Sequence, residues 1–394
     1  MWHRRDFLRL GSAGALASLL PLQRAVAVEG SNLNFLFLLA RGGWDITRVF
    51  APEFDNEIVA MEASAIRVDV GDLSYVHDDS RPNVAAFFDA HAASTLILNG
   101  ISVPSVAHGN CEKLILTGGS AESAPDWAAA VASAAPELPL PHVVLSGTSY
   151  AGNLGGVSTR IGTNGMLAKL LDGSIHDVVD RPSGQHLPAV ARLLDQRLRG
   201  RAEMDGAFEE ALLRASQMKD LQDTIQWEVG PGIEEQAIFS IQAFANGLSR
   251  SASIEVPGVA GGWDTHQNND VDQTSSFEKF FGALNAILPQ ISENTVVVAM
   301  SEMGRTPHLN GDEGKDHWPY TSAMIIGPGI TGGRTVGGFD DAFYGRMVDP
   351  ISGDSSDSGV EISTGTFGAT LLTLAGMDSE EILPGYAPLS GVLT

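Results

Sequence analysis

The sequence has little of what several classes of protein depend on. It contains a single cysteine, Cys111, so no disulfide can form within the chain. Lys and Arg total 24 against 48 Asp and Glu, which gives a formal net charge of −24. A surface this acidic repels nucleic acid and anionic lipid, and this excludes both as main partners. Neither a Walker A motif nor a Gly-x-Ser-x-Gly motif is present, so no P-loop or serine-hydrolase chemistry is indicated.

Long apolar runs are also missing. The longest mild one, residues 10–22, is shorter than the roughly 18 to 20 residues that a bilayer requires, so we expect no stable membrane span. It follows Arg4-Arg5 and precedes Ala25-Val26-Ala27, the three parts of a signal peptide. The paired arginines favour the twin-arginine type. We therefore expect residues 1–27 to be a signal peptide, the twin-arginine translocase to be a partner, and the protein to be periplasmic or secreted.

The remainder, residues 28–394, has the pattern of one elaborated α/β domain. Continuous apolar runs typical of buried parallel strands occur at 33–40, 95–99, 142–145, 295–300 and 323–326. Helical patterns lie between them, at 83–90, 126–134, 236–249, 276–288 and 367–375. This alternation predicts a doubly wound, mainly parallel sheet with helices on both faces. Residues 187–226, rich in Leu, Ala, Arg, Glu and Gln, predict a helical insertion.

Acids and histidines follow several of the predicted strands, where an α/β sheet binds its ligands. The candidates stand in Gly-Gly-Trp-Asp (42–45), Gly-Gly-Trp-Asp-Thr-His (261–266), Ser-Glu-Met-Gly-Arg-Thr-Pro (301–307) and Gly-Lys-Asp-His-Trp-Pro (314–319). The predicted metal ligands are Asp45, Asp264, His266, Glu302, Asp316 and His317. Carboxylates with imidazoles suit one or two divalent ions, Zn²⁺ or Mn²⁺ best. The alternative for any one acid is a helix N-cap.

These motifs, with the twin-arginine leader, resemble the bacterial exported family known as domain of unknown function 1501. The resemblance covers nearly all of residues 28–394 and is most specific at 301–319. That family is grouped with the alkaline phosphatase and sulfatase superfamily, which implies a doubly wound α/β fold and often a two-metal site. By this likeness Asp45 matches a first-strand metal aspartate, and Asp264 and His266 match a central Asp/His pair. Glu302 stands where the superfamily has an aspartate, and His317 where it has a late histidine ligand.

The sequence also departs from the superfamily. Asp264 and His266 are closer together than the usual spacing, and Met303 stands where a histidine ligand is expected after Glu302. Either one metal is held weakly, or His308 or Asp316 substitutes for the missing ligand.

A nucleophile is expected at a helix N-terminus beside the metals, where backbone N–H groups stabilise an anion. The matching stretch is 108–112, with Cys111 as nucleophile and His108 as ligand or general acid. It resembles the Gly-Asn-Ser-Glu loop of cofactor-independent phosphoglycerate mutase, with Cys111 in place of the serine. The alternative for Cys111 is a buried core residue. The segment that follows lacks the Cys-x-Pro/Ala-x-Arg motif needed for conversion to formylglycine. Arg305 or Arg48 could clamp an oxyanion or form a fold-holding salt bridge.

Two functions follow from these patterns. The first is an exported metal-dependent hydrolase of phosphate or sulfate esters, with metals activating water or Cys111. The second is a non-catalytic exported binding or assembly protein that keeps the hydrolase fold. The retained acids favour the first, and the missing histidine after Glu302 favours the second.

Overall fold

The computed structural model describes residues 32–162, 225, 227–259 and 262–394. The predicted signal peptide lies outside these residues, and so does the predicted helical insertion apart from position 225. Among the helices of the described ranges, none is both long and apolar enough to cross a bilayer.

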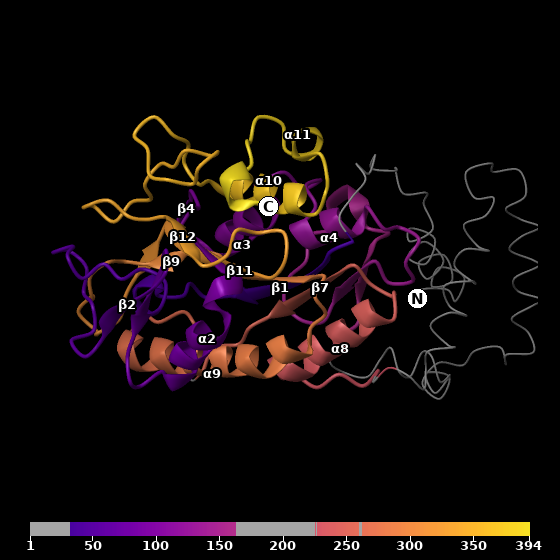
Figure 1. The fold of residues 1–394 in the computed structure, drawn as a ribbon. Helices are drawn as coiled ribbons and strands as arrows, with labels where there is room; N and C mark the ends of the chain where they lie inside the picture. Colours follow the sequence, from indigo (N-terminus) through magenta and orange to yellow (C-terminus); the bar gives the residue numbers. More distant parts are fainter. Residues whose placement is uncertain (1–31, 163–224, 226, 260–261) are drawn as a thin grey trace, which may run out of the picture.

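The core of the described chain is an eight-stranded sheet (Figure 1). Its spatial order is β12 (Arg334–Gly337), β4 (Thr95–Ser102), β11 (Tyr320–Ile326), β8 (Thr295–Ser301), β1 (Asn34–Ala40), β7 (Ser251–Glu255), β5 (His142–Val144) and β6 (Ser158–Arg160). Every pairing is parallel except those of β11, which runs antiparallel to both β4 and β8. The prediction of a mainly parallel sheet is confirmed.

Helices cover both faces of this sheet. Those on one face are α2 (Pro82–His91), α8 (Ile233–Ala245) and α9 (Asn269–Ile287), below the sheet in Figure 1. Those on the other are α3 (His108–Thr117), α4 (Trp127–Ala132) and α10 (Thr364–Leu374), above it. Central strand β1 shows why both layers form: Leu36 and Leu38 pack into one apolar cluster, and Phe35 and Phe37 into the other. A strand buried on both faces reads as a continuous apolar run, which is the pattern that predicted it.

The remaining elements are short. They are α11 (Ser379–Ile382), the hairpin β2 (Ile66–Val70) and β3 (Leu73–His77), the ribbon β9 (Gly304–Arg305) and β10 (His317–Trp318), and the 3₁₀ helices η1 (Ile46–Arg48), η2 (Ala92–Ser94), η3 (Gly152–Leu154), η6 (Leu288–Gln290) and η7 (Ser390–Val392).

The direction of β11 matters for the site. Because β11 is antiparallel, its first residue, Tyr320, lies at the edge where the parallel strands end. The segment just before it, with His317, therefore meets the loops that follow β1 and β8. The sequence predicted a strand here but not its direction.

Candidate metal centre

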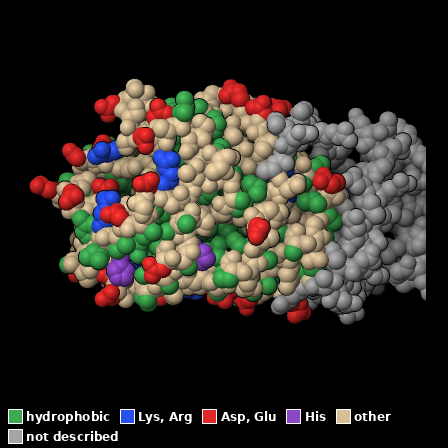
Figure 2. Space-filling view, in the orientation of Figure 1, with side chains coloured by type: hydrophobic (Ala, Val, Ile, Leu, Met, Phe, Trp, Pro, Cys, Tyr) green, Lys and Arg blue, Asp and Glu red, His purple; other side chains and the backbone are tan. Residues whose placement is uncertain are grey.

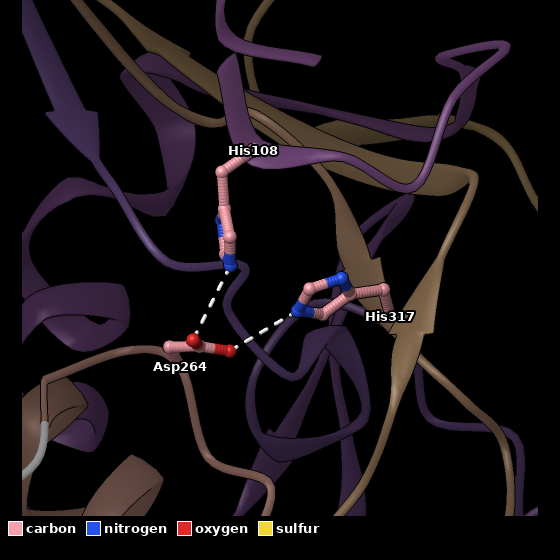
Figure 3. Close-up of side chains that lie close together, drawn as sticks. All are labelled: His108, Asp264 and His317. Carbon is pink, nitrogen blue, oxygen red and sulfur yellow. Dashed lines mark hydrogen bonds and ion pairs between the residues drawn. The ribbon is translucent and has the colours of Figure 1, made fainter. Parts of the chain in front are cut away.

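Four separate segments bring histidines and acids together at the carboxyl edge of the sheet. His108 is the first residue of α3, and Asp264 and His266 lie in the loop between β7 and α9. Glu302 directly follows β8, and His317 begins β10. Figure 3 shows His108, Asp264 and His317 approaching one another from a helix, a loop and a strand. In the described part of the chain, these three form the group of side chains whose ligand atoms all lie within 4.8 Å of one another.

Asp264 is the centre of this group. Its Oδ2 lies 3.3 Å from Nε2 of His108. Its Oδ1 lies 3.1 Å from Nε2 of His317 and 3.2 Å from Nε2 of His266. The side chains of Asp264 and His266 are 42% and 45% exposed, so a small molecule can approach from the solvent side.

Each of the three imidazoles is fixed by its other nitrogen. Nδ1 of His317 lies 2.7 Å from the backbone carbonyl of Val106. Nδ1 of His108 lies 2.9 Å from Glu302 Oε1, and Nδ1 of His266 lies 2.9 Å from Asp316 Oδ1. A ring nitrogen held by a carbonyl or carboxylate is the usual support of a metal-ligating histidine, because it sets the tautomer and the ring orientation.

This support leaves an electrostatic problem that a cation would solve. A carbonyl or carboxylate only accepts hydrogen bonds, so each Nδ1 carries the proton and a neutral ring has a lone pair on Nε2. Nε2 of His266 and Nε2 of His317 are only 3.0 Å apart, and both face Asp264. Lone pairs and a carboxylate at these distances repel unless the rings are protonated or a cation lies between them. The donor set therefore fits a divalent ion with nitrogen and oxygen ligands.

The pKa directions agree with this concentration of charge. Partial burial raises the pKa of Asp264, but Arg305 and His317 outweigh it and hold that pKa at about 2. The hydrogen bond to Glu302 raises the pKa of His108. The hydrogen bond with His266 lowers the pKa of Asp316. Both Asp264 and Asp316 therefore stay ionised as acceptors.

Glu302 lies behind His108 and is fully buried. Its Oε1 accepts from the backbone N–H of Gly42 at 2.7 Å and faces His108 Nδ1, while Oε2 accepts from Ser301 Oγ at 3.1 Å. The structure thus shows Glu302 orienting a ring. Its predicted role as a direct ligand stays a prediction, and so does that of Asp316, which orients His266.

Asp45 is surrounded by donors from the protein itself. Oδ1 accepts from the backbone N–H and hydroxyl of Thr47, and Oδ2 accepts from Arg48, Asn269 and Lys315. Burial raises the pKa of Asp45, but Lys315 and Arg48 outweigh it and hold the pKa far below its ordinary value. Asp45 also caps η1, which is the alternative that its sequence position left open. Cationic side chains of the protein therefore pair with Asp45 where a metal ion was predicted, and its ligand role stays a prediction.

Arg305 holds three loops together. Its guanidinium donates to the backbone carbonyls of Gly43 (2.8 Å), Lys315 (3.0 Å), Trp263 (3.1 Å) and Gly42, and to Asp264 Oδ1 (2.6 Å). The side chain is fully buried. Of the two roles that the sequence left open for Arg305, the structure shows the contacts of the fold-holding one.

Gly42 allows the close approach of these loops. Its φ is +133°, and a Cβ at this position would lie 2.7 Å from the backbone nitrogen of Asp264. Any side chain here would push the loop after β1 away from the loop that carries Asp264.

Cys111 is fully buried in the apolar cluster between α3, α10 and the sheet. Burial raises the pKa of the Cys111 thiol, so the thiolate is disfavoured. These observations fit the core alternative for Cys111, and the nucleophile role stays a prediction that they do not favour. Met303 is likewise a buried core side chain, and His308 is exposed with its backbone carbonyl bonded to Thr306.

The sequence indicates His108 as a ligand or general acid and gives no sign of the role of Val106. The clue to His108 was its place at the start of a helix after a buried strand. Nothing in the residue type of Val106 indicates that its carbonyl would orient His317, because a backbone contact across 211 positions depends on the fold alone.

Part of the chain matches a known family model. Residues 242–390, which include Asp264, Glu302 and His317, match the model of a family described as "Protein of unknown function (DUF1501)". No curated protein matches the chain. Among solved structures, the chain is similar to a protein in the alkaline phosphatase superfamily from Vibrio parahaemolyticus, at 9% identity over 93% of this chain and 72% of that one, with a TM-score of 0.43.

Two further solved structures are similar at the same distant level. The lipoteichoic acid synthase LtaP from Listeria monocytogenes is 8% identical over 93% of this chain and 78% of that one, with a TM-score of 0.42. The C-terminal periplasmic domain of EptC from Escherichia coli is 8% identical over 93% and 89%, with a TM-score of 0.41.

Proposed function

We propose that this protein is a metal-dependent hydrolase of phosphate or sulfate esters. The observation that carries the proposal is the convergence of three imidazole Nε2 atoms on the Asp264 carboxylate, each ring fixed through Nδ1 by an oxygen acceptor. Such supported rings cost little reorganisation when they bind an ion. The ligands in this proposal are Asp264, His108, His317 and, at the solvent edge, His266.

A divalent ion held by these side chains would supply Lewis-acid stabilisation of the negative charge that develops on a phosphoryl or sulfuryl oxygen. Zn²⁺ and Mn²⁺ fit the nitrogen-rich donor set better than Mg²⁺. The chain itself supplies the other parts. Its positive helix end at His108 faces the same place and favours an anion there. Because Cys111 is buried, we propose water as the attacking group.

Neighbouring side chains orient the ligands. Glu302 holds His108, Asp316 holds His266, and Arg305 holds Asp264. A 1 Å displacement of any ligand would weaken the ion's coordination, so these contacts are part of the proposed site.

The alternative is a non-catalytic binding or assembly protein that keeps the fold, with one ion or with none. The contacts of Asp45 with Lys315 and Arg48 favour this alternative over a two-metal enzyme. They also agree with an enzyme that holds a single ion, so metal content alone does not separate the two functions.

The test is metal analysis of freshly purified protein, followed by a screen of phosphate monoesters, phosphodiesters and sulfate esters. The hydrolase proposal expects a stoichiometric divalent ion and ester hydrolysis that a chelator abolishes. An ion with no hydrolysis of any ester class would favour the binding protein. Protein without a bound ion that still melts at the same temperature after chelation would refute the metal-dependent hydrolase and favour the binding protein.

Export through the twin-arginine route is proposed on the sequence alone. Replacing Arg4 and Arg5 with lysine is expected to leave precursor in the cytoplasm, because the route requires the paired arginines. Fractionation of cells would measure this. Continued efficient export in a strain without the twin-arginine translocase would contradict the proposal.

A further inference from the structure

In an ester hydrolase a cation besides the metal can bind the substrate's oxyanion, and the two arginines expected for this role are occupied. Arg48 and Arg305 are buried, and their side chains bond to protein acceptors. Arg41 differs from both. Its side chain is 46% exposed, and only Nε is bonded, at 3.2 Å from Glu112 Oε2. Its other two guanidinium nitrogens make no hydrogen bond within the described part of the chain.

Arg41 lies beside the candidate metal centre. It directly precedes Gly42, whose N–H meets the same Glu302 oxygen as Nδ1 of His108, at 2.7 Å and 2.9 Å. Glu112 follows His108 by four residues on α3, so both side chains are on one face of the helix. Because helical side chains tilt toward the N-terminus, the Glu112 carboxylate lies over the turn that His108 begins. Arg41 therefore runs along the face that carries His108.

Glu112 fixes the orientation of Arg41. The side chain of Glu112 is 4% exposed, and its second oxygen, Oε1, is buried without a hydrogen-bond partner in the described residues. A buried carboxylate with one unsatisfied oxygen depends on its cation. Glu112 thus holds the Nε side of Arg41, and in the described residues the two terminal nitrogens make no hydrogen bond. A guanidinium fork of this kind matches the geometry of phosphate and sulfate oxygens.

We propose that Arg41 binds the phosphate or sulfate oxygens of an ester substrate at the edge of the metal centre, and that Glu112 is its positioning residue. This inference rests on the proposed hydrolase function and adds a substrate contact that the sequence motifs did not indicate.

The carboxylates around Arg41 affect how strongly it can bind an anion. Glu112, Glu255 and Glu302 all act electrostatically on Arg41, so one guanidinium faces three carboxylates. Arg41 alone is outnumbered and cannot attract an anion strongly. A divalent ion at the neighbouring histidines would offset the excess negative charge. Oxyanion binding should therefore require both Arg41 and the ion.

The experiment is a calorimetric titration of inorganic phosphate, and separately of inorganic sulfate, into Mn²⁺-loaded and chelated protein. We expect binding to the loaded protein only. Arg41→Gln should lower phosphate affinity about ten-fold or more, because a hydrogen bond to a charged group is worth at least that. Arg41→Lys should recover part of the loss. Metal content should be unchanged in both variants.

Arg67→Gln is the matched control, because Arg67 is an exposed arginine paired with Asp69 in the β2–β3 hairpin. It should bind phosphate like the unaltered protein. Glu255→Gln should bind phosphate more tightly, since it removes a repelling charge near Arg41. Glu112→Gln should lower affinity, and adding it to Arg41→Gln should cause no further loss, because Glu112 acts through Arg41.

Different outcomes would overturn the role of Arg41 and the proposed hydrolase function. Equal phosphate and sulfate affinities in the Mn²⁺-loaded Arg41→Gln variant and the unaltered protein would overturn the role of Arg41 and leave the hydrolase proposal standing. A protein that binds no metal and hydrolyses no ester would overturn the hydrolase proposal itself. Circular dichroism spectra of each variant identify any that fail to fold, and the Arg41→Lys comparison then still decides the question.

Discussion

Two neighbouring groups of charged residues at the same sheet edge behave in opposite ways. In the buried network of Asp45, Arg48 and Lys315, the carboxylate is fully enclosed and meets two protein cations. In the histidine cluster of His108, Asp264, His266 and His317, a 42% exposed carboxylate meets three imidazole nitrogens and the guanidinium of Arg305. In both groups the aspartate ends a Gly-Gly-Trp-Asp segment that follows a strand.

The difference lies in which partners carry charge at neutral pH. Lysine and arginine bring fixed positive charge, so the buried network is complete without an ion. In the histidine cluster Arg305 is the one fixed cation that pairs with Asp264, and the neutral imidazoles bring lone pairs, so the cluster needs a further cation or protons. Similar motifs therefore yield a structural ion-pair network in one place and a candidate metal centre in the other. Figure 2 adds that one face of the molecule carries more Asp and Glu side chains than Lys and Arg, so fixed positive charge is scarce.

The largest expected effect comes from breaking the buried network. Asp45→Asn should lower the free energy of unfolding by about 3–5 kcal/mol, because it leaves the buried Lys315 without the carboxylate with which it pairs. Urea denaturation of metal-free protein measures this. Asp312→Asn, in an exposed loop, is the control and should change stability little. If Asp45→Asn lost stability only in the presence of metal, Asp45 would be a ligand and the contrast between the two groups would fail.

The next effect tests the histidine cluster. An ion that binds only the folded protein stabilises it by about 2.7 kcal/mol when the free ion is at 100 times its Kd. Chelation should therefore lower the melting temperature of the unaltered protein. His317→Ala should lose most of its bound metal and melt like the chelated form. His142→Ala is not a suitable control because His142 is fully buried. His308→Ala, an exposed histidine outside the cluster, should keep its metal.

A smaller effect should follow from loosening one supported ring. Asp316→Asn weakens the acceptor that faces His266 Nδ1 and should lower metal affinity about 10- to 100-fold, the usual result of losing such a support. Competition with a chelator of known affinity measures the change. Unfolding of the metal-free variant should be nearly unaltered, since Asp316 is 60% exposed. An unchanged metal affinity would show that His266 does not bind the ion.

The smallest effect is on how stability depends on pH, which should have opposite slopes without and with the metal. The hydrogen bond to Glu302 raises the pKa of His108 in the folded protein above the unfolded value of about 6.5. Metal-free protein then holds more protons when folded, so this contribution to stability is full below about pH 6.5 and is lost as pH rises through the folded pKa. With metal bound the slope should reverse, because protons compete with the ion. Thermal melting at pH 5.5 to 8.5 with and without chelator, compared with His108→Asn, isolates the effect; identical slopes would contradict it.

Local sequence patterns predicted several of the individual strands and helices. The apolar run that became β1 predicted a strand buried on both faces, and the structure gives Asn34–Ala40. The patterns at 83–90 and 276–288 likewise predicted α2 and α9, although α9 begins earlier, at Asn269. Strand β7 was not predicted, because Ser251–Glu255 is short and lacks an apolar run. The sequence also did not reveal that β11 is antiparallel, since strand direction depends on pairing and not on residue type.

What the sequence by itself determined was the α/β class and the edge of the sheet where the acids and histidines gather, because strands, turns and their ends follow local chemistry. What only the tertiary structure decided was the partner of each acid. Asp45 and Asp264 stand in the same Gly-Gly-Trp-Asp tetrapeptide, yet Asp45 meets Lys315 and Arg48 while Asp264 meets histidines and Arg305. Lys315, His108, Arg305 and His317 lie far away in the sequence from the aspartate that each contacts, so the balance between fixed charge and lone pairs is set only when the sheet brings them together.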